Sequence, residues 1–279
     1  MVISSVMKAR LRRAGIEEEM HLEPAEGIAE LASSIGDSCP SRSSASVVTM
    51  THDVDYVAGY ECVREMAELE AERGIRATYN FLVGAGYEVD QSCLLTLRGL
   101  GHEIGLHGHG YDLRLAYRRQ STILQRLRDA KNVLQDLLGE PVVGFRNHSM
   151  LLSARLLSAI ESLGFLYDSG LSARHVRNSF NLYFCWPFRY EGRALFEVPV
   201  MWPQDTEVFR VVGMSDTEAL EYYQRRIAMA LDFGGVACLN HHPSIMRRHR
   251  EYFSALLEFI EGLPHGTSTC RETVLRWGL

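Results

Sequence analysis

The stretch Val47-Val48-Thr49-Met50-Thr51-His52-Asp53-Val54-Asp55 is a short β-branched run that ends in two carboxylates one position apart. Valine and threonine favour extended strands, and open α/β proteins collect their sites at the carboxyl edge of the sheet. The stretch therefore predicts a strand that delivers Asp53 and Asp55 to a functional site. Two carboxylates placed in this way are typical of a metal ligand beside a general base.

Composition favours a globular protein over a nucleic-acid-binding or membrane-spanning one. The 279 residues and the hydrophobic fraction of 46% suffice for one large domain. The net charge of -6 argues against a nucleic-acid partner, which would need a basic face. No apolar run approaches the length of a membrane span, and Glu17-Glu18-Glu19 stands where a secretory apolar region would lie.

The cysteines point to the same kind of protein. Six cysteines are scattered without any C-x-x-C pair, which argues against a zinc ribbon and against a disulfide scaffold. Free thiols in a reducing compartment account for them, so we expect a cytoplasmic protein. No motif addresses the oligomeric state, and a homo-oligomer is left open.

Residues 1–46 differ in composition from the rest of the chain. The stretch from Ser33 to Ser46 holds seven serines together with Gly36, Asp37 and Pro40. It is too polar and too rich in turn residues for a core element. We expect 1–46 to be a partly irregular extension and 47–279 to be the functional domain. A lid over the site, a dimer contact and a dispensable tail are all open roles for the extension.

Strand-like and helix-like segments alternate from Val47 onward, as in a βα-repeating architecture with parallel strands. The clearest helical pattern runs from about Leu113 to Leu138 and is closed by Gly139. Two others follow Ser153 and the capping box Ser215-Asp216-Thr217-Glu218. The alternation predicts either a barrel-like or a doubly wound α/β fold. The seven expected strands are Val47–Thr51, Arg76–Leu82, Glu103–Leu106, Val142–Arg146, Phe165–Tyr167, Phe196–Val200 and Val236–Asn240.

Polar side chains follow several of these strands. The third strand is followed by His107-Gly108-His109-Gly110-Tyr111-Asp112, in which two glycines allow the backbone to turn tightly beside a ligand. Because the carboxyl ends of parallel strands meet at one edge, we expect these residues to lie close to the first strand's carboxylates. The other polar strand ends are Arg146-Asn147-His148, Asp168-Ser169 and Asn240-His241-His242-Pro243.

A series of short motifs gives a more specific indication. The pieces THDVD, GHEIGLHGHGYD, GFRNH, LGFLYDSGLS, LFEVPV and CLNHHP occur in this order over about residues 47–245. The series resembles the motifs of the polysaccharide deacetylase family, also called NodB-homology or carbohydrate esterase family 4. The resemblance implies an α/β fold of the distorted (β/α)7 barrel type. It also implies one divalent metal ion, with zinc expected, and hydrolysis of an N-acetyl group on an amino sugar.

The resemblance also implies roles for individual residues. Asp53 falls on the general base, and Asp55 and His107 fall on metal ligands. Arg146 falls on the arginine that holds the base in place. The late histidine that acts as general acid falls on His241 or His242, and the proline that follows favours His242. These roles are chemically consistent, because a metal lowers the pKa of bound water while a base and an acid on either side move protons.

The chain departs from the family pattern at Tyr111, four residues after His107, where the family usually has a second metal histidine. Asp112, His109 and His148 are the three open replacements, the last reaching across from the next strand end. A rebuilt metal site is favoured over a lost one. His148 itself stands where the family more often has proline.

Aromatic residues gather from Phe180 to Tyr190, and a tryptophan follows the sixth strand. A packed loop and a platform on which a sugar ring stacks are both open readings of the aromatic stretch. The expected substrate contacts are Tyr111, His148, Trp186, Trp202 and Leu239.

The leading hypothesis is a cytoplasmic metal-dependent deacetylase that cleaves a C–N amide bond in a small or carrier-linked amino sugar. One alternative is a catalytically impaired, sugar-binding relative of the same fold. Another is a D-x-D nucleotide-sugar glycosyltransferase, which would leave His107, Arg146 and His242 without a role. Hydrolysis of a related amide or cyclic imide on the same scaffold is a nearer alternative, since a fold does not determine its substrate.

Overall fold

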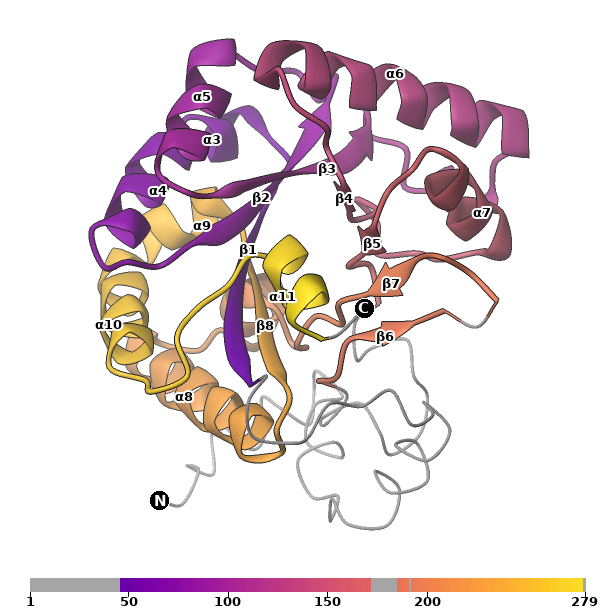
Figure 1. The fold of residues 1–279 in the computed structure, drawn as a ribbon. Coiled ribbons are helices and arrows are strands. Elements are labelled where there is room, and N and C mark those ends of the chain that lie inside the picture. The colour runs from indigo at the N-terminus through magenta and orange to yellow at the C-terminus, as the bar shows by residue number, and fades with distance from the viewer. Residues whose placement is uncertain (1–45, 172–184, 191, 278–279) are drawn as a thin grey trace.

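The computed structural model of the protein describes residues 46–171, 185–190 and 192–277. Within these residues, one curled sheet of eight strands forms the centre of the fold. The strand order is β6-β7-β5-β4-β3-β2-β1-β8, and every pair is parallel except β6 with β7. The sheet bends into an open barrel with helices on its outer face (Figure 1). The extension expected at 1–46 lies outside the described residues except for Ser46. The strands are β1 (Val47–Val54), β2 (Ala77–Val83), β3 (Glu103–His109), β4 (Gly144–Phe145), β5 (Tyr167–Asp168), β6 (Phe188–Arg189), β7 (Phe196–Glu197) and β8 (Val236–His241).

The predicted fold class, a distorted α/β barrel, is confirmed. Each of the seven expected strands overlaps an observed one, and β6 is an additional two-residue strand inside the aromatic stretch. Such a short strand has no periodicity that a sequence could show. Irregular segments bridge the open edges of the sheet: Met201 N donates to Cys238 O at 2.8 Å, and Val236 N donates to Cys185 O at 2.6 Å.

The centre of the sheet explains why the first strand carries polar residues without exposing them. β1 pairs in parallel with both β2 and β8, and all eight of its residues are buried. Successive side chains of a strand point to opposite faces. Thr51 and Asp53 therefore share the inner face of the barrel, while His52 points outward under the helices.

The helices cover the outer face of the sheet, and several were predicted. The helix expected after Ser153 begins there, with the Ser153 hydroxyl accepting from Leu156 N. The capping box of Ser215 and Glu218 is present at the start of α8. The helical elements are α3 (Val57–Tyr60), α4 (Val63–Ala71), α5 (Gln91–Gly99), the 3-10 turn η2 (Leu115–Tyr117), α6 (Gln120–Leu138), α7 (Ala154–Ser162), the π-helical segment η4 (Thr206–Val212), α8 (Asp216–Asp232), α9 (Pro243–Arg248), α10 (Arg250–Glu261) and α11 (Cys270–Arg276).

The single helix expected from Leu113 to Leu138 is two elements, so that prediction was wrong at its start. η2 ends at Tyr117, and Arg118 and Arg119 are extended before α6 begins. The carboxylate of Asp112 accepts from Arg114 N at 3.1 Å and from two arginine side chains, which holds this segment as a turn. The predicted end is confirmed, because Gly139 adopts the left-handed conformation there.

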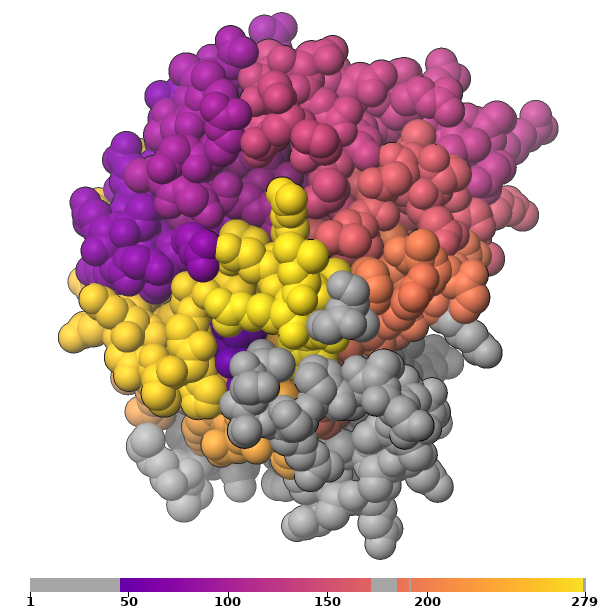
Figure 2. Space-filling view, viewed as in Figure 1, coloured from indigo at the N-terminus to yellow at the C-terminus, as the bar shows by residue number. Residues whose placement is uncertain are grey.

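The last helix, α11, covers the amino ends of the first strands. Thr273 Oγ1 lies 2.8 Å from Thr49 Oγ1, Ser268 N donates to Val48 O, and Cys270 N donates to Thr78 Oγ1. Figure 2 shows this yellow segment over the middle of the face. A functional site is therefore expected at the opposite, carboxyl end. None of the helices in the described ranges is long and apolar enough to cross a membrane.

Candidate active site

The carboxyl ends of the strands bring a carboxylate and three imidazoles together. Asp55, just beyond β1, lies at the centre. Its Oδ1 is 3.2 Å from His107 Nε2 and 3.7 Å from His148 Nε2, and its Oδ2 is 3.3 Å from His242 Nε2. Burial acts to raise the pKa of Asp55, but the adjacent imidazoles of His107 and His242 hold it below its usual value. The group Asp53, Asp55, His107, His148 and His242 is called the strand-end cluster below.

A bulge in β3 directs His107 into the strand-end cluster. Phe81 pairs with Leu106 but Leu82 pairs with Gly108, so His107 is the extra residue in the ladder. Its Nδ1 lies 2.9 Å from the carbonyl oxygen of Arg146 and must carry a hydrogen to bond it. The other ring nitrogen then faces the carboxylates. Burial acts to lower the pKa of His107, but Asp53 and Asp55 raise it overall.

Asp53 is held from three sides. Its Oδ1 accepts from Arg146 Nη1 at 2.9 Å and from Asn80 Nδ2 at 3.1 Å, and its Oδ2 accepts from Asn240 Nδ2 at 2.7 Å. Burial acts to raise the pKa of Asp53, yet the positive charges of Arg146, His107 and His242 bring it down to about 2. Asp53 is therefore ionised and fixed in orientation, with Oδ2 3.6 Å from His107 Nε2.

The guanidinium of Arg146 is completely buried and acts as a rigid support for Asp53. It also donates to Thr51 Oγ1 at 2.8 Å and to Asn240 Oδ1 at 2.7 Å. Its remaining donors bond the backbone oxygen and the hydroxyl of Ser169. A buried guanidinium is tolerated only when its donors are satisfied, as they are here.

His241, the last residue of β8, and His242, which continues the extended backbone, point in opposite directions, as alternation along an extended chain requires. His242 Nδ1 lies 2.7 Å from Asp205 Oδ1, and its backbone N donates to Asp205 Oδ2 at 2.6 Å. Burial acts to lower the pKa of His242, but Asp205 and Asp55 raise it well above its usual value. His241 instead lies under the helices with Nε2 3.0 Å from Tyr252 Oη, and burial lowers its pKa to about 4.

Asp205 is a candidate functional residue that the sequence interpretation missed. It is fully buried beside His242, and burial acts to raise its pKa while His242 lowers it. It follows the sixth expected strand by five positions, too far from the strand end for the sequence to place it at the same edge of the sheet.

The strand-end cluster has a donor set that suits a metal ion. Asp55 Oδ1 is buried without a hydrogen-bond partner in the described part of the chain. Ligands about 2.1 Å from a zinc ion are themselves about 3.4 Å apart. The distances from Asp55 Oδ1 to His107 Nε2 and to His148 Nε2, 3.2 and 3.7 Å, are similar. Within the described ranges, no group of three or more His, Cys, Asp or Glu side chains already stands in metal-binding geometry. The donor types, one carboxylate and two imidazoles, fit such an ion, and the side chains would have to move to hold it.

Two of the replacements expected for the missing histidine lie elsewhere. Asp112 faces away from the strand-end cluster and pairs with Arg118 at 3.0 Å and with Arg126 at 2.6 Å. His109 packs near Gly84, and its buried Nδ1 has no hydrogen-bond partner among the described residues. Of the three replacements, the structure brings only His148 into contact with Asp55.

The expected substrate contacts divide into two groups. Trp186, Trp202 and Leu239 are buried in the core, with the two tryptophans only 7% exposed. Tyr111 is 49% exposed and its ring lies 5.6 Å from that of His148. Its hydroxyl donates to Asp55 O and to Ala85 O, so it borders the strand-end cluster without facing the carboxylates. Tyr56, which the sequence interpretation passed over, stacks on Tyr111 at 5.4 Å. Tyr183 and Phe184 lie outside the described residues.

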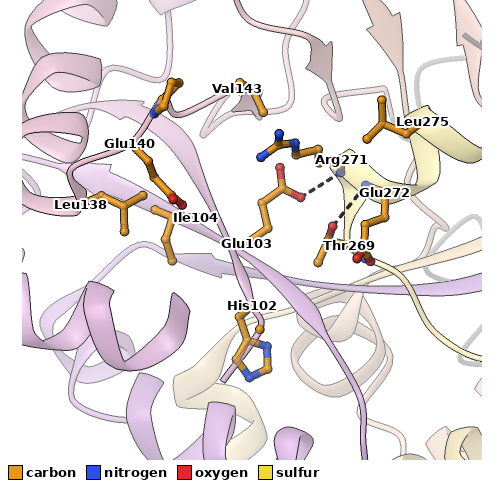
Figure 3. Close-up of a pocket in the computed structure, with 12 residues that line it drawn as sticks. His102, Glu103, Ile104, Leu138, Glu140, Val143, Thr269, Arg271, Glu272 and Leu275 are labelled. Atoms are coloured by element: carbon orange, nitrogen blue, oxygen red, sulfur yellow. Dashed lines mark hydrogen bonds between the residues drawn. The ribbon is translucent and has the colours of Figure 1, made fainter. Parts of the chain in front are cut away.

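A hollow of about 340 Å³ lies at the other end of β3 and is not part of this site (Figure 3). Its lining includes Glu103, the first residue of β3, whereas His107 lies near the strand's carboxyl end. The Glu103 carboxylate accepts from Thr78 Oγ1, from Tyr167 Oη and from Arg271 N, each at 2.9 Å. With its hydrogen bonds made within the protein, Glu103 joins β3 to β2, β5 and α11.

Comparison with known proteins finds a matching family over part of the chain and solved structures with a similar fold. The model of the family described as "Polysaccharide deacetylase" matches residues 41–167, which include Asp53, Asp55, His107, Arg146 and His148. A candidate polysaccharide deacetylase from Mycobacterium smegmatis has a similar fold, with a TM-score of 0.71 and 18% identity over 86% of this chain and 92% of that chain.

Two more distant structures share the fold. The chitin deacetylase of Colletotrichum lindemuthianum matches with a TM-score of 0.56 and 12% identity over 84% of this chain and 88% of that chain. A family 4 pseudoenzyme from Bacillus anthracis matches with a TM-score of 0.56 and 12% identity over 82% of this chain and 65% of that chain. The fold thus accompanies both active and inactive proteins, and activity has to be argued from the residues.

Proposed function

We propose that this chain, whose residues 41–167 match the polysaccharide deacetylase family model, is a metal-dependent hydrolase of that family. Its reaction is the removal of an N-acyl group, expected to be N-acetyl, from an amino sugar. The observation that carries the proposal is the arrangement around Asp55. Asp53, a fixed and ionised carboxylate, lies near Asp55. His242, whose imidazole pairs with the buried carboxylate of Asp205, lies near it as well.

Asp55, His107 and His148 are the residues that would hold the metal. One carboxylate and two imidazoles are a set that zinc and similar divalent ions accept, with positions left for water and substrate. When bound, the ion polarises the acyl carbonyl and lowers the pKa of a water molecule. Arg146 orients one of these ligands. Its carbonyl oxygen accepts a hydrogen bond from His107 Nδ1, so that His107 Nε2 faces Asp55.

The protons move between this chain's own side chains. Asp53, ionised because its pKa is about 2, takes a proton from the attacking water. His242, whose pKa is raised well above its usual value by Asp205 and Asp55, acts in its protonated form and gives its proton to the leaving amine nitrogen. Asp205 keeps the imidazolium stable and orients it through Nδ1. The carbon–nitrogen bond breaks as that nitrogen gains its proton.

A catalytically impaired sugar-binding protein of the same fold is the second candidate. The Bacillus anthracis pseudoenzyme shows that this fold can occur without activity. Against it stand the fixed carboxylate of Asp53 and the imidazole of His242 paired with Asp205, which suit the proposed base and acid. The glycosyltransferase alternative is weaker, because both oxygens of Asp53 already bond Arg146, Asn80 and Asn240 and are not free for a metal–diphosphate. The cytoplasmic location stays a prediction.

The test combines metal content with acetate release. Protein purified without chelators is expected to contain about one divalent ion per chain and to release acetate from N-acetylated amino sugars. The variant Asp53→Asn should keep the metal while losing about 10²–10⁴-fold in kcat, the usual contribution of a general base. If the metal-loaded protein released no acyl group from any amino sugar, the proposed hydrolase activity would be rejected in favour of the sugar-binding alternative.

A further inference from the structure

A second hollow, of about 360 Å³, opens beside the strand-end cluster. It is lined by His109, Gly110, Tyr111, Asp112, Arg118 and Arg126. Tyr111 joins it to the cluster, since its hydroxyl bonds Asp55 O and its ring lies against that of His148. The hollow and the strand-end cluster are therefore adjacent at Tyr111.

The charge within the hollow is not balanced. Asp112 accepts from Arg118 Nε at 3.0 Å, from Arg118 Nη2 at 3.2 Å and from Arg126 Nη1 at 2.6 Å. One carboxylate thus faces two guanidinium groups, which leaves a net positive charge. The Arg118 and Arg126 side chains are 50% and 40% exposed, so further N–H donors are open to a ligand. Guanidinium donors suit the oxygens of carboxylates and phosphates in particular.

The sequence around the hollow adds further positive charge. Residues 113–128 contain five arginines and no acidic residue, in a chain whose net charge is -6. Two of these arginines, Arg118 and Arg126, line the hollow. A positive segment on an acidic protein, beside a reaction site, is expected to attract an anionic ligand to that site.

The aromatic surface between the two sites has the properties of a sugar platform. Tyr56 and Tyr111 stack with their ring centroids 5.4 Å apart, and both are about half exposed. An aromatic pair that is not covered by the protein offers a face on which a sugar ring can lie.

We propose that the hollow at Arg118 and Arg126 binds an anionic substituent of the substrate, a carboxylate or a phosphate. The sugar ring lies against Tyr111 while its N-acyl group reaches the strand-end cluster. This proposal rests on the proposed function and narrows it from amino sugars in general to acidic or phosphorylated ones. The role of Asp112 is to position the two arginines.

A purely structural role for the arginines predicts a different result. In that case the bonds to Asp112 only hold the turn before α6, and binding would not depend on the charge of the sugar. Ligand charge is therefore the variable to change, and the comparison of anionic with neutral sugars separates the two roles.

The experiment measures binding to the variant Asp53→Asn, loaded with zinc, so that turnover is not required. Its probes are N-acetylglucosamine, the 1-phosphate and 6-phosphate of that sugar, and N-acetylmuramic acid, which carries a carboxylate. We expect at least one anionic sugar to bind about 10-fold or more tightly than the neutral one, because hydrogen bonds to charged groups are strong. The anion that binds best distinguishes a phosphate source from a carboxylate source.

Adding Arg118→Gln or Arg126→Gln to this protein should reduce the preference for the anionic sugar about 10-fold. Adding Arg64→Gln, which removes an equally exposed cation paired with Asp90, should leave the preference unchanged. Equal binding of all four sugars would overturn the proposal, as would a preference that persists in both arginine variants, since the metal alone would then attract the anion. Loss of the proposed function would appear separately, as wild-type protein that binds these sugars without releasing acetate.

Discussion

At the scale of single residues, three side chains of the strand-end cluster, Asp53, His107 and His242, have partners that determine what they can do. Arg146 and two amides keep Asp53 ionised and fixed, the Arg146 carbonyl orients His107, and Asp205 supports His242. The chemistry of the cluster therefore depends on residues behind it as much as on those that face the substrate.

His148 is predicted to replace the histidine that Tyr111 displaces. The variant His148→Ala should bind zinc at least about 10-fold more weakly, because one of three protein ligands is removed. The measurement is competition with a chromophoric chelator. His109→Ala is the matched control and should retain wild-type affinity, since His109 packs at Gly84. Unaltered zinc affinity in His148→Ala would show that another residue completes the site.

Asp205 is predicted to determine the alkaline limit of activity. His242 acts in its protonated form, so activity is present below its pKa and is lost as the pH rises through it. Asp205 raises that pKa, as does Asp55. The variant Asp205→Asn should therefore move the alkaline limb of the kcat profile to lower pH and reduce kcat by about 10-fold or more. An unmoved alkaline limb would mean that His242 is not the group that titrates there.

At the scale of elements, the close approach of β2 and β3 supports the base. Asn80 on β2 lies over Gly105 on β3, where a Cβ atom would stand 2.3 Å from Asn80 Oδ1. Asn80 also donates to Asp53, so only glycine at this position lets β2 carry the amide that orients the carboxylate.

Gly105→Ala is therefore predicted to impair both folding and activity. The displaced Asn80 should cost about 1–3 kcal/mol in the free energy of unfolding, as overpacking of a core does. Loss of its bond to Asp53 should lower kcat further than the change in stability alone explains. Urea unfolding and acetate release measure the two effects. Gly99→Ala is the control, because a Cβ atom there meets nothing within 4 Å. Normal kcat in Gly105→Ala would remove Asn80 from the supporting residues.

The elements also show where sequence patterns are informative. Long, regular elements such as β1, β8 and α8 were predicted because their periodicity and caps are local properties. The two-residue strand β6 and the break before α6 were not predicted. β6 exists only through its pairing with β7, and the break depends on side-chain bonds to Asp112.

At the scale of the whole molecule, the barrel has two polar layers of opposite character. The inner layer, at the carboxyl ends of the strands, is the strand-end cluster. The outer layer lies between the sheet and the helices, where His52 bonds Glu70 at 2.6 Å and His241 bonds Tyr252. Adjacent residues of the same strands supply both layers, because side chains alternate across the sheet.

The outer layer is predicted to make stability depend on pH. Burial lowers the pKa of His241 to about 4, against an ordinary value of 6.5. Between these values the unfolded chain binds a proton that the folded protein does not, so stability falls as the pH falls from 6.5 towards 4. This difference corresponds to about 3 kcal/mol.

The variant His241→Gln should therefore lose less stability than the wild type on acidification. Urea unfolding at about pH 7 and about pH 4.5 measures the difference. The exposed His265 provides the control, and His265→Gln should behave as the wild type does. An equal acid-induced loss in wild type and His241→Gln would show that His241 is not responsible.

The amino-acid sequence by itself determined the alternation of strands and helices, the family resemblance and the polar residues at the strand ends. These are local properties, set by periodicity, by caps and by the order of short motifs. Only the tertiary structure decided that His148 rather than Asp112 approaches Asp55, that Asp205 pairs with His242, and that His241 faces the helices. Those outcomes depend on which strand ends are neighbours and on the face of the sheet to which each side chain points. The curled sheet brings distant strand ends together, and a sequence pattern does not contain that information.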